Sequence, residues 1–325
     1  MREDGPGKAL RRVAVTGAHG FIGRETVRLA RESGFALSVL TRALPGPASC
    51  GVLPAALDLH TPRAELARAL AGHQTVLHLA GMTNPRARET VLHAANAALT
   101  EHLAEAAAAA GVRRFVYVSS LKVHGEGGIE PYTAASPIAP LDAYGRSKRD
   151  AELALADIAA RTGMELAVVR PPLVLGPGAK GNIAALSKAL RWGMPLPLGG
   201  LGANRRSLIG LRDLAALLLE LAGAAEVPGL PLLVHSPPAL STRDLVLALA
   251  QAHGLPPRLF SVAEPLLRGS LGTLGLGAAC TRLCGSLWLD DSAALARIAW
   301  RPRFGLAFEW ARMAGGPRVE KASER

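Results

Sequence analysis

Residues 16–23 read TGAHGFIG and join a short apolar run to a helical pattern. The run before them, RVAVTGA at 12–18, is typical of a β-strand, and GRETVRLARES after it has the apolar spacing of an amphipathic helix. The turn contains three glycines, Gly17, Gly20 and Gly23. A strand-to-helix turn that receives a pyrophosphate needs glycine for the bend, for close approach of the anion and for helix-to-sheet contact. The stretch therefore predicts a phosphate-binding turn.

The same alternation of strand and helix patterns continues through the first two-thirds of the chain. Further apolar strand patterns lie at 36–42, 55–59, 75–81, 114–120 and 166–176, and helical patterns lie at 62–72, 89–111 and 143–163. Strands that alternate with helices build a parallel sheet covered on both faces. We therefore predict an α/β fold, a doubly wound parallel (Rossmann) sheet with a smaller C-terminal α/β domain.

The domain organisation follows from a change of pattern near residue 176, where prolines and glycines become frequent. We expect the dinucleotide-binding domain at 11–176, with return segments at about 205–236, the substrate-binding domain mainly at 177–313, and disordered ends at 1–10 and 314–325.

Composition limits the classes of partner. Lys and Arg number 37 against 26 Asp and Glu, a net charge of +11 that favours anionic partners such as phosphate-bearing small molecules. Only 4% of residues are aromatic, which leaves little material for stacking nucleic-acid bases, so nucleic acid is not expected. The N-terminus lacks an apolar stretch and no run reaches membrane-helix length, so we expect a cytoplasmic protein without an integral membrane segment. Cys50, Cys280 and Cys284 are interpreted as buried free thiols, and no metal site is expected.

The residues after the second and third strand patterns bear on which dinucleotide binds. An acidic residue after the second strand would hold a ribose 2′-hydroxyl, whereas an arginine tolerates a 2′-phosphate. Arg42 occupies that place, which favours NADP over NAD. Asp58 follows the next strand and could accept from the adenine amino group, or could be an ordinary loop aspartate.

Tyr144 and Lys148 in AYGRSK are four residues apart at the start of a helical pattern, so their side chains share a face. An ammonium beside a phenol favours the phenolate, so we expect the pKa of Tyr144 to be lowered from its usual value of ~10. Tyr144 could then exchange a proton with a carbonyl or alcohol oxygen while nicotinamide exchanges hydride. Ser119 or Ser120, at the end of a strand, would bind the same oxygen.

In order and separation, TGAHGFIG, HLAG, VSS and YGRSK resemble the extended short-chain dehydrogenase/reductase family, also called the NAD-dependent epimerase/dehydratase family. The resemblance implies a catalytic Ser120, Tyr144 and Lys148. It implies cofactor contacts at Gly17, Gly20, Phe21, Ile22, Gly23, Arg42, Asp58, Leu59, Leu79, Ala80, Gly81, Tyr144, Lys148 and Pro171. In related 4,6-dehydratases an Asp-Glu pair follows the catalytic hydroxyl residue. Here Leu121 and Lys122 stand there, so dehydration is not expected.

SSLKVHGE, GPGAKGN and PLPLGGLGANRRSLIGLRDLAALL, with STRDLVLALA and RLCGSLWLDD, resemble bacterial 4-keto-reductases that form UDP-N-acetylquinovosamine for surface polysaccharide. That resemblance implies hydride delivery to C4 of a UDP-linked, N-acetylated 6-deoxy-hexos-4-ulose. It is consistent with substrate contacts at Thr83, Ser120, His124, Asn182, Arg206 and Arg282. His124 is interpreted either as shaping its loop or as contacting the sugar.

Several alternatives stay open. A UDP-hexose 4-epimerase that retains NAD would need the same residues, and a non-catalytic dinucleotide-sensing protein on this fold ranks below both. His78 is interpreted as a buried, hydrogen-bonded histidine, and Asn96 either anchors a backbone group or water or is solvated. We expect a homodimer built on the helices at 89–111 and 143–162, by analogy with the family.

Overall fold

The computed structural model describes residues 12–41, 51–84, 86–128, 130–273, 277–290, 292, 298 and 300–315. The chain divides into two compact units. The first consists of Met1–Val123, Asp142–Val169 and Ala215–Leu232, and the second of His124–Leu141, Arg170–Leu214 and Leu233–Arg325. The tails expected to be disordered lie almost wholly outside the described residues.

A seven-stranded sheet forms the centre of the first unit, with the strand order β3-β2-β1-β4-β5-β6-β9. Its strands are β1 (Arg12–Thr16), β2 (Ala36–Thr41), β3 (Gly51–Ala56), β4 (Thr75–His78), β5 (Arg114–Val118), β6 (Glu165–Arg170) and β9 (Leu232–Leu233). The five neighbouring pairs from β3 to β6 are parallel. The chain leaves β1 towards β2 on one side and returns to β4 on the other. Ligands of doubly wound folds bind at this reversal, beyond the carboxyl ends of β1 and β4.

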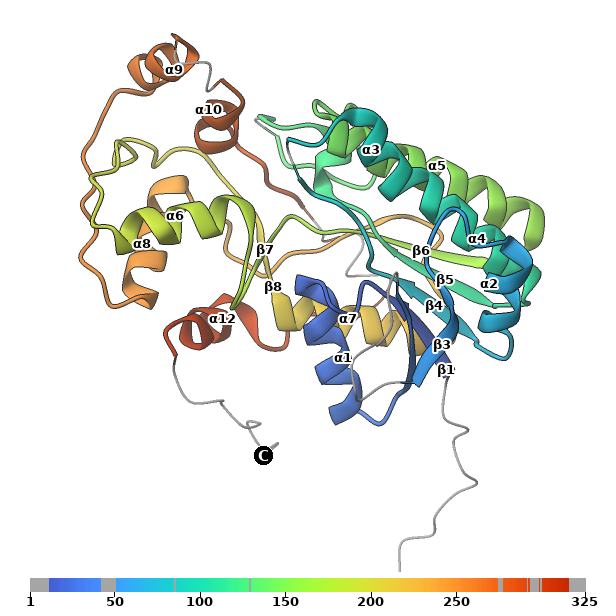
Figure 1. Cartoon of the computed structure of the whole chain (residues 1–325). Coiled ribbons are helices and arrows are strands. Elements are labelled where there is room, and N and C mark those ends of the chain that lie inside the picture. The colour runs from blue at the N-terminus through green and yellow to red at the C-terminus, as the bar shows by residue number, and fades with distance from the viewer. Residues whose placement is uncertain are drawn as a thin grey trace, which may run out of the picture. The chain divides into compact units, whose positions relative to one another are not determined.

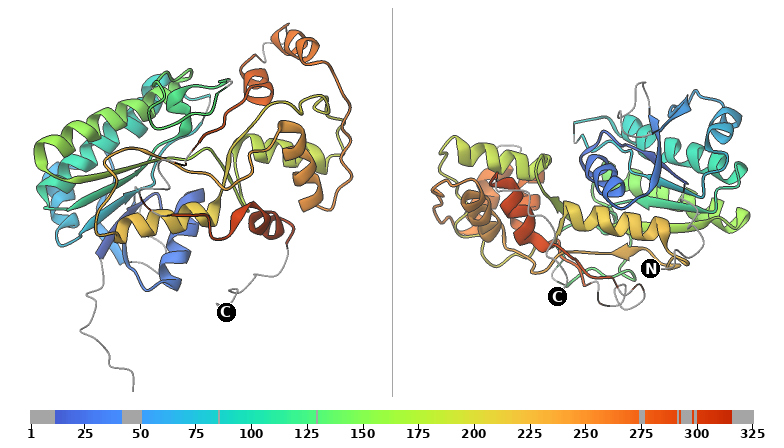
Figure 2. Two further views of the ribbon diagram at one scale, coloured as in Figure 1. Left: turned by 180° about the vertical axis from the view of Figure 1, so that it is seen from behind. Right: turned by 90° about the horizontal axis from the view of Figure 1, so that it is seen from below.

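Helices cover both faces of this sheet, as Figures 1 and 2 show. On one face lie α1 (Phe21–Glu32) and α7 (Leu211–Gly223), and on the other α2 (Arg63–Leu70), α4 (Leu99–Ala109) and α5 (Ala143–Thr162). The short helix α3 (Glu89–His93) continues into α4 through a π-helical turn at Ala94–Ala98. All residues of β4 and β5 are buried, as expected for strands enclosed on both faces. The predicted doubly wound fold is confirmed.

His78, at the end of β4, is completely buried and both of its ring nitrogens are hydrogen-bonded. Thr16 Oγ1 accepts from the amides of Leu79 and Ala80, so its own proton is donated to Nδ1 of His78 at 2.7 Å. Nε2 of His78 then donates to Oγ1 of Thr100 at 2.9 Å. Burial, together with the charge of Lys148, lowers the pKa of His78 to about 3. The interpretation of His78 as a buried, satisfied histidine is confirmed.

The lowered pKa of His78 makes stability depend on pH. The unfolded chain protonates this histidine near its usual value of ~6.5, whereas the folded protein resists protonation until about pH 3. The contribution of His78 is therefore present above pH ~6.5 and is lost as the pH falls towards 3. Between about pH 7.5 and 5 we expect the unfolding free energy of the wild type, relative to His78→Gln, to fall by roughly 2 kcal/mol in urea titrations. A difference that is independent of pH would contradict a neutral His78.

The second unit contains a two-stranded parallel sheet, β7 (Leu173–Leu175) and β8 (Leu208–Gly210). Its helices include α6 (Gly181–Arg191), α8 (Thr242–Ala252), α9 (Glu264–Thr273), α10 (Gly277–Cys284) and α12 (Gly305–Met313). Leucines of β7, β8, α6 and α8 share one core with Cys280 and Cys284. These two cysteines are buried free thiols, as expected, whereas Cys50 lies outside the described residues. Within the described ranges, no cluster of possible metal ligands occurs.

The boundary between the units differs from the expectation in two places. The pattern at 166–176, interpreted as one strand, is divided into β6 and β7 because Pro171 and Pro172 offer no amide to a ladder. The first unit therefore ends this segment at Val169 rather than at residue 176. Residues 124–141 also belong to the second unit, because the amides of Gly127 and Tyr132 donate to the carbonyls of Ser286 and Trp288.

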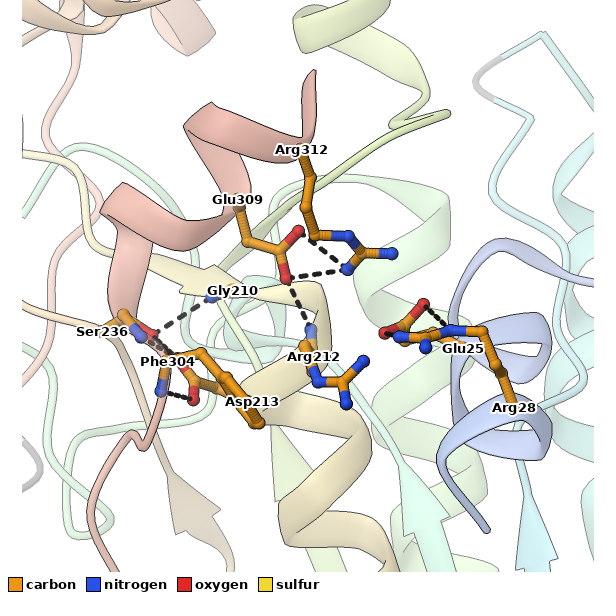
Figure 3. Close-up of polar contacts among 10 residues, drawn as sticks. Glu25, Arg28, Gly210, Arg212, Asp213, Ser236, Phe304, Glu309 and Arg312 are labelled. Carbon is orange, nitrogen blue, oxygen red and sulfur yellow. Dashed lines mark hydrogen bonds and ion pairs between the residues drawn. The ribbon is translucent and has the colours of Figure 1, made fainter. Parts of the chain in front are cut away.

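Two buried carboxylates of the second unit cap each other's helices, as Figure 3 shows. Asp213, near the start of α7, accepts from the amides of Arg303, Phe304 and Gly305 at 2.8–2.9 Å, where α12 begins. Glu309 of α12 accepts in return from the amide of Arg212 at 2.8 Å. The two acidic residues are 1% and 0% exposed. Each helix thus satisfies amide groups at the other's N-terminus, which have no partner within their own helix.

Candidate active site

The turn after β1 requires its glycines. Gly17 has φ of +70°, and a Cβ there would lie 2.6 Å from the amide nitrogen of Ala80. A Cβ on Gly23 would lie 2.1 Å from the carbonyl oxygen of Gly17, so helix and turn touch closely. The amide of Gly20 closes the turn by donating to that same carbonyl at 2.8 Å. The predicted backbone geometry is therefore present.

The N-terminus of α1 suits an anion. Gly20 is its N-cap and has no side chain to bond the first amides, and the first turn, which begins with Phe21 and Ile22, contains no acidic residue. The amides and the helix dipole there favour negative charge. A dinucleotide pyrophosphate fits this cradle, and Gly17, Gly20 and the first turn of α1 would hold it.

The segment after β4 brings backbone against two side chains of the site. A Cβ on Gly81 would lie 3.2 Å from both Nζ of Lys148 and Oδ1 of Asn96. Glycine is needed where side chains pack this closely on the main chain. Leu79 and Ala80, which precede Gly81, are held in place because their backbone amides donate hydrogen bonds to Oγ1 of Thr16 at 3.2 Å. The ends of β1 and β4 and the helix α5 thus meet at one place.

Asn96 anchors a backbone group, which was one of its two interpretations, and is not a solvated helix residue. It is completely buried in the π-helical turn, and its side-chain amide both accepts from and donates to the main chain of Met82, at 2.7 and 2.9 Å. It also donates to Oγ of Ser147 at 2.9 Å. Asn96 therefore joins the loop after β4 to the helix that carries Tyr144 and Lys148.

The three residues expected to be catalytic lie at neighbouring places. Ser120 follows β5, and its hydroxyl is close enough to the phenol of Tyr144, in the first turn of α5, to lower the pKa of that phenol. Lys148 follows one turn later, is 4% exposed and donates to the carbonyl oxygen of Val118 at 2.9 Å. Ser119 is used otherwise, because it is buried and its hydroxyl donates to Glu152 of α5. This difference supports the preference for Ser120 over Ser119.

The pKa of Tyr144 does not follow the expectation from Lys148. Burial, opposed by the hydroxyl of Ser120 and assisted by the carboxylate of Asp142, raises the pKa of Tyr144 to about 12. Burial also lowers the pKa of Lys148 to about 8, against the attraction of Glu152. The expected lowering of the Tyr144 pKa is therefore wrong in this structure. Desolvation penalises both charged forms, and the phenol stays protonated at neutral pH.

An ion pair that sequence reasoning left without a role lies beside the catalytic residues. Nζ of Lys122 is 2.7 Å from Oδ2 of Asp142, and Oδ1 of Asp142 accepts from the amide of Gly145 at 2.7 Å as the N-cap of α5. An Asp directly before AYGRSK is a recognisable N-cap signal. Its pairing with Lys122, twenty residues earlier, is not.

The remaining cofactor candidates of the first unit are exposed. Asp58 accepts from the amide of His60 at 2.8 Å, the contact of a loop aspartate, and Leu59 is 40% exposed. Thr83, a candidate for substrate rather than cofactor contact, is exposed after β4. Arg42 lies outside the described residues, so the structure adds nothing to the expectation about NADP.

Candidates of the second unit occupy separate positions within it. Both ring nitrogens of His124 bond to protein groups, Pro137 O and Arg170 Nη1, each at 3.0 Å, which supports a role in shaping the loop. Arg206 is 9% exposed and donates to Gly285 O at 2.8 Å, and burial lowers its pKa. Pro171 is buried just after β6, Asn182 is the second residue of α6, and Arg282 lies half-buried on α10.

Comparison with known proteins agrees with this geometry. Residues 13–229 match the NAD dependent epimerase/dehydratase family. The chain belongs to this family.

Two relatives of the family resemble the chain along most of its length. A UDP-glucose 4-epimerase of Vibrio cholerae is 30% identical over 315 residues, which cover 92% of this chain and 93% of that protein. A ceramide reductase of Caulobacter vibrioides is 30% identical over 325 residues and covers 93% and 95% of the two chains. Among solved structures, MoeE5 in complex with UDP-glucuronic acid and NAD superposes with a TM-score of 0.75 at 26% identity, over 94% of this chain and 98% of that one.

Among the described residues, no helix is long and apolar enough to span a membrane.

Proposed function

We propose that the protein reduces the 4-keto group of a UDP-linked, N-acetylated 6-deoxy-hexos-4-ulose with NADPH or NADH, for surface polysaccharide. The observation that carries this proposal is that Ser120 and Tyr144 are neighbours, while the two residues after Ser120 have no carboxylate. Leu121 is buried and Lys122 is ion-paired with Asp142, so the two residues after Ser120 supply no carboxylate for water elimination. Hydride exchange at a carbonyl is the reaction that these side chains support.

The residues divide the work between them. NAD(P)H, when bound, supplies the hydride for C4. Ser120 donates a hydrogen bond to O4 and orients it, and Tyr144 gives its phenolic proton to O4 as negative charge develops there. A phenol with a pKa of about 12 is protonated throughout the neutral range, as a proton donor must be. Lys148 would hold the cofactor ribose, and its positive charge favours the phenolate left behind.

For the substrate, we propose that Arg206 and Asn182 bind the diphosphate, with Arg282 near the nucleotide, Thr83 facing the sugar and His124 shaping the loop after Ser120. The guanidinium fork of an arginine matches the oxygens of a diphosphate.

For the cofactor, Arg42 supports NADP over NAD because it follows the second strand. We also propose a homodimer formed by α3, α4 and α5, where Val91 and Leu153 are 37% and 63% exposed. Light scattering tests this assembly.

A UDP-hexose 4-epimerase with tightly bound NAD is the second candidate. The Vibrio cholerae relative, which is similar to 92% of this chain, is a UDP-glucose 4-epimerase. As an epimerase, this protein would use the same serine, tyrosine and lysine. A non-catalytic sensor ranks lower, because the chain has both Tyr144 and Lys148. Tyr144 is half-buried and Lys148 is buried one helical turn away.

The proposal is tested by incubating the purified protein with UDP-2-acetamido-2,6-dideoxy-hexos-4-ulose and either reduced cofactor, followed by NMR of the product. We expect stoichiometric oxidation of the cofactor and a new hydroxyl at C4. Parallel incubations contain UDP-glucose, and a ketone form of ceramide with reduced cofactor. Conversion of UDP-glucose to UDP-galactose by protein that purifies with bound NAD would establish the epimerase instead. Turnover of the ceramide ketone alone would remove the nucleotide sugar from the proposal.

A further inference from the structure

We propose that Lys122 is a positioning residue that fixes the catalytic serine and tyrosine relative to each other through Asp142. This inference rests on the proposed function, since it takes Tyr144 as the proton donor. The ion pair in question joins two segments of the first unit, the turn after β5 and the start of α5.

The backbone of Lys122 is held from both sides. It lies in a 3₁₀ turn, Leu121–His124, in which the neighbouring Leu121 and Val123 are 1% and 0% exposed. Its amide donates to Oγ of Ser120 at 3.3 Å. That bond uses one lone pair of the Ser120 oxygen and leaves the hydroxyl proton available for the phenol of Tyr144.

The side chain of Lys122 acts on the segment that contains Tyr144, the first turn of α5, through Asp142. Its ammonium is 2.7 Å from Oδ2 of Asp142, while Oδ1 of the same carboxylate accepts from the amide of Gly145. Asp142 is therefore bound at both oxygens, to Lys122 and to the first turn of α5, and Tyr144 lies in that turn. Contacts run from Ser120 to Lys122, to Asp142, to the turn with Tyr144, and back to Ser120.

The charge of Lys122 has a second effect on the tyrosine. The Asp142 carboxylate raises the pKa of Tyr144, as burial does. An ammonium 2.7 Å from that carboxylate offsets its negative charge. Other groups that act on or near the phenol are Ser120 and Tyr117. The Lys122–Asp142 ion pair thus links the charge of Lys122 to the phenol of Tyr144.

Lys122→Met is the direct test, with Lys122→Arg as the conservative variant and Arg161→Gln as the matched control. Arg161 forms ion pairs with Glu105 and Asp157 at the far end of the same helix. With the substrate that the wild type turns over, we expect kcat to fall about 10- to 100-fold in Lys122→Met, with KM changed less than about twofold. Lys122→Arg should recover most of kcat, and Arg161→Gln should match the wild type.

Asp142→Asn separates positioning from general stability, because Asn also serves as an N-cap. In this background Lys122→Met should cause little further loss of kcat, since the partner charge is already gone. Losses that multiply in the double variant, or a Lys122→Met enzyme equal to Arg161→Gln, would overturn the proposal.

A spectroscopic readout works without any substrate. The chain has three tyrosines, so ¹³Cζ-labelled tyrosine gives three signals, and that of Tyr144 is identified by its loss in Tyr144→Phe. We expect this signal to move in Lys122→Met and to stay in place in Arg161→Gln. An unmoved signal contradicts the positioning role even if no nucleotide sugar is turned over. Full activity of Tyr144→Phe would instead contradict the proposed function.

Discussion

Tyr144→Phe is expected to lower kcat for ketone reduction by about 10²- to 10⁴-fold, the usual contribution of a positioned proton donor. The ring that packs at the start of α5 is retained, so only the phenolic proton is removed. In the wild type that proton is held on the phenol by a pKa of about 12. Single-turnover oxidation of the reduced cofactor, followed by absorbance, measures the loss directly.

Tyr132→Phe is the control for that experiment. Tyr132 stacks on His124 with ring centroids 5.5 Å apart, and phenylalanine keeps this contact. We expect the control to retain activity within a few-fold of the wild type. If Tyr144→Phe and Tyr132→Phe turned over the substrate equally, Tyr144 would not be the proton donor, and another acid would have to be sought.

The second large effect concerns Asp213, which is outside the candidate active site. Asp213→Ala should destabilise the second unit by about 3–5 kcal/mol, because three amides and the hydroxyl of Ser236 lose a buried charged acceptor together. The amide of Phe304, the N-cap residue of α12, loses its acceptor (Figure 3). Thermal unfolding followed by circular dichroism should show a midpoint lower by several degrees.

Two further variants identify the cause. Asp157→Ala removes an aspartate that is 72% exposed on α5, and we expect it to change stability by less than about 0.5 kcal/mol. Asp213→Asn keeps one acceptor oxygen and should fall between Asp213→Ala and the wild type. If Asp213→Ala were no less stable than Asp157→Ala, the reciprocal capping of α7 and α12 would contribute nothing to stability.

Local patterns account for most of the first unit. Gly17 and Gly23 could be assigned because a turn against a neighbouring strand excludes Cβ, and the structure places such atoms 2.6 and 2.1 Å from backbone. The Tyr144–Lys148 spacing could be assigned to one helix face because helical periodicity is a short-range property. The long strand pattern at 166–176 failed where Pro171 and Pro172 interrupt it, which moved the domain boundary.

The choice of Ser120 over Ser119 came from the resemblance to a family. The sequence by itself determined the doubly wound fold, the glycine turn after β1 and the placing of Tyr144 and Lys148 on one helix face. These depend on residue type and spacing over a few turns. Only the tertiary structure decided the partner of Lys122, the mutual caps of Asp213 and Glu309, and the direction of the Tyr144 pKa shift. Those features depend on which segments, distant along the chain, meet and exclude water, and for Tyr144 the effect of burial exceeds that of the Ser120 hydroxyl.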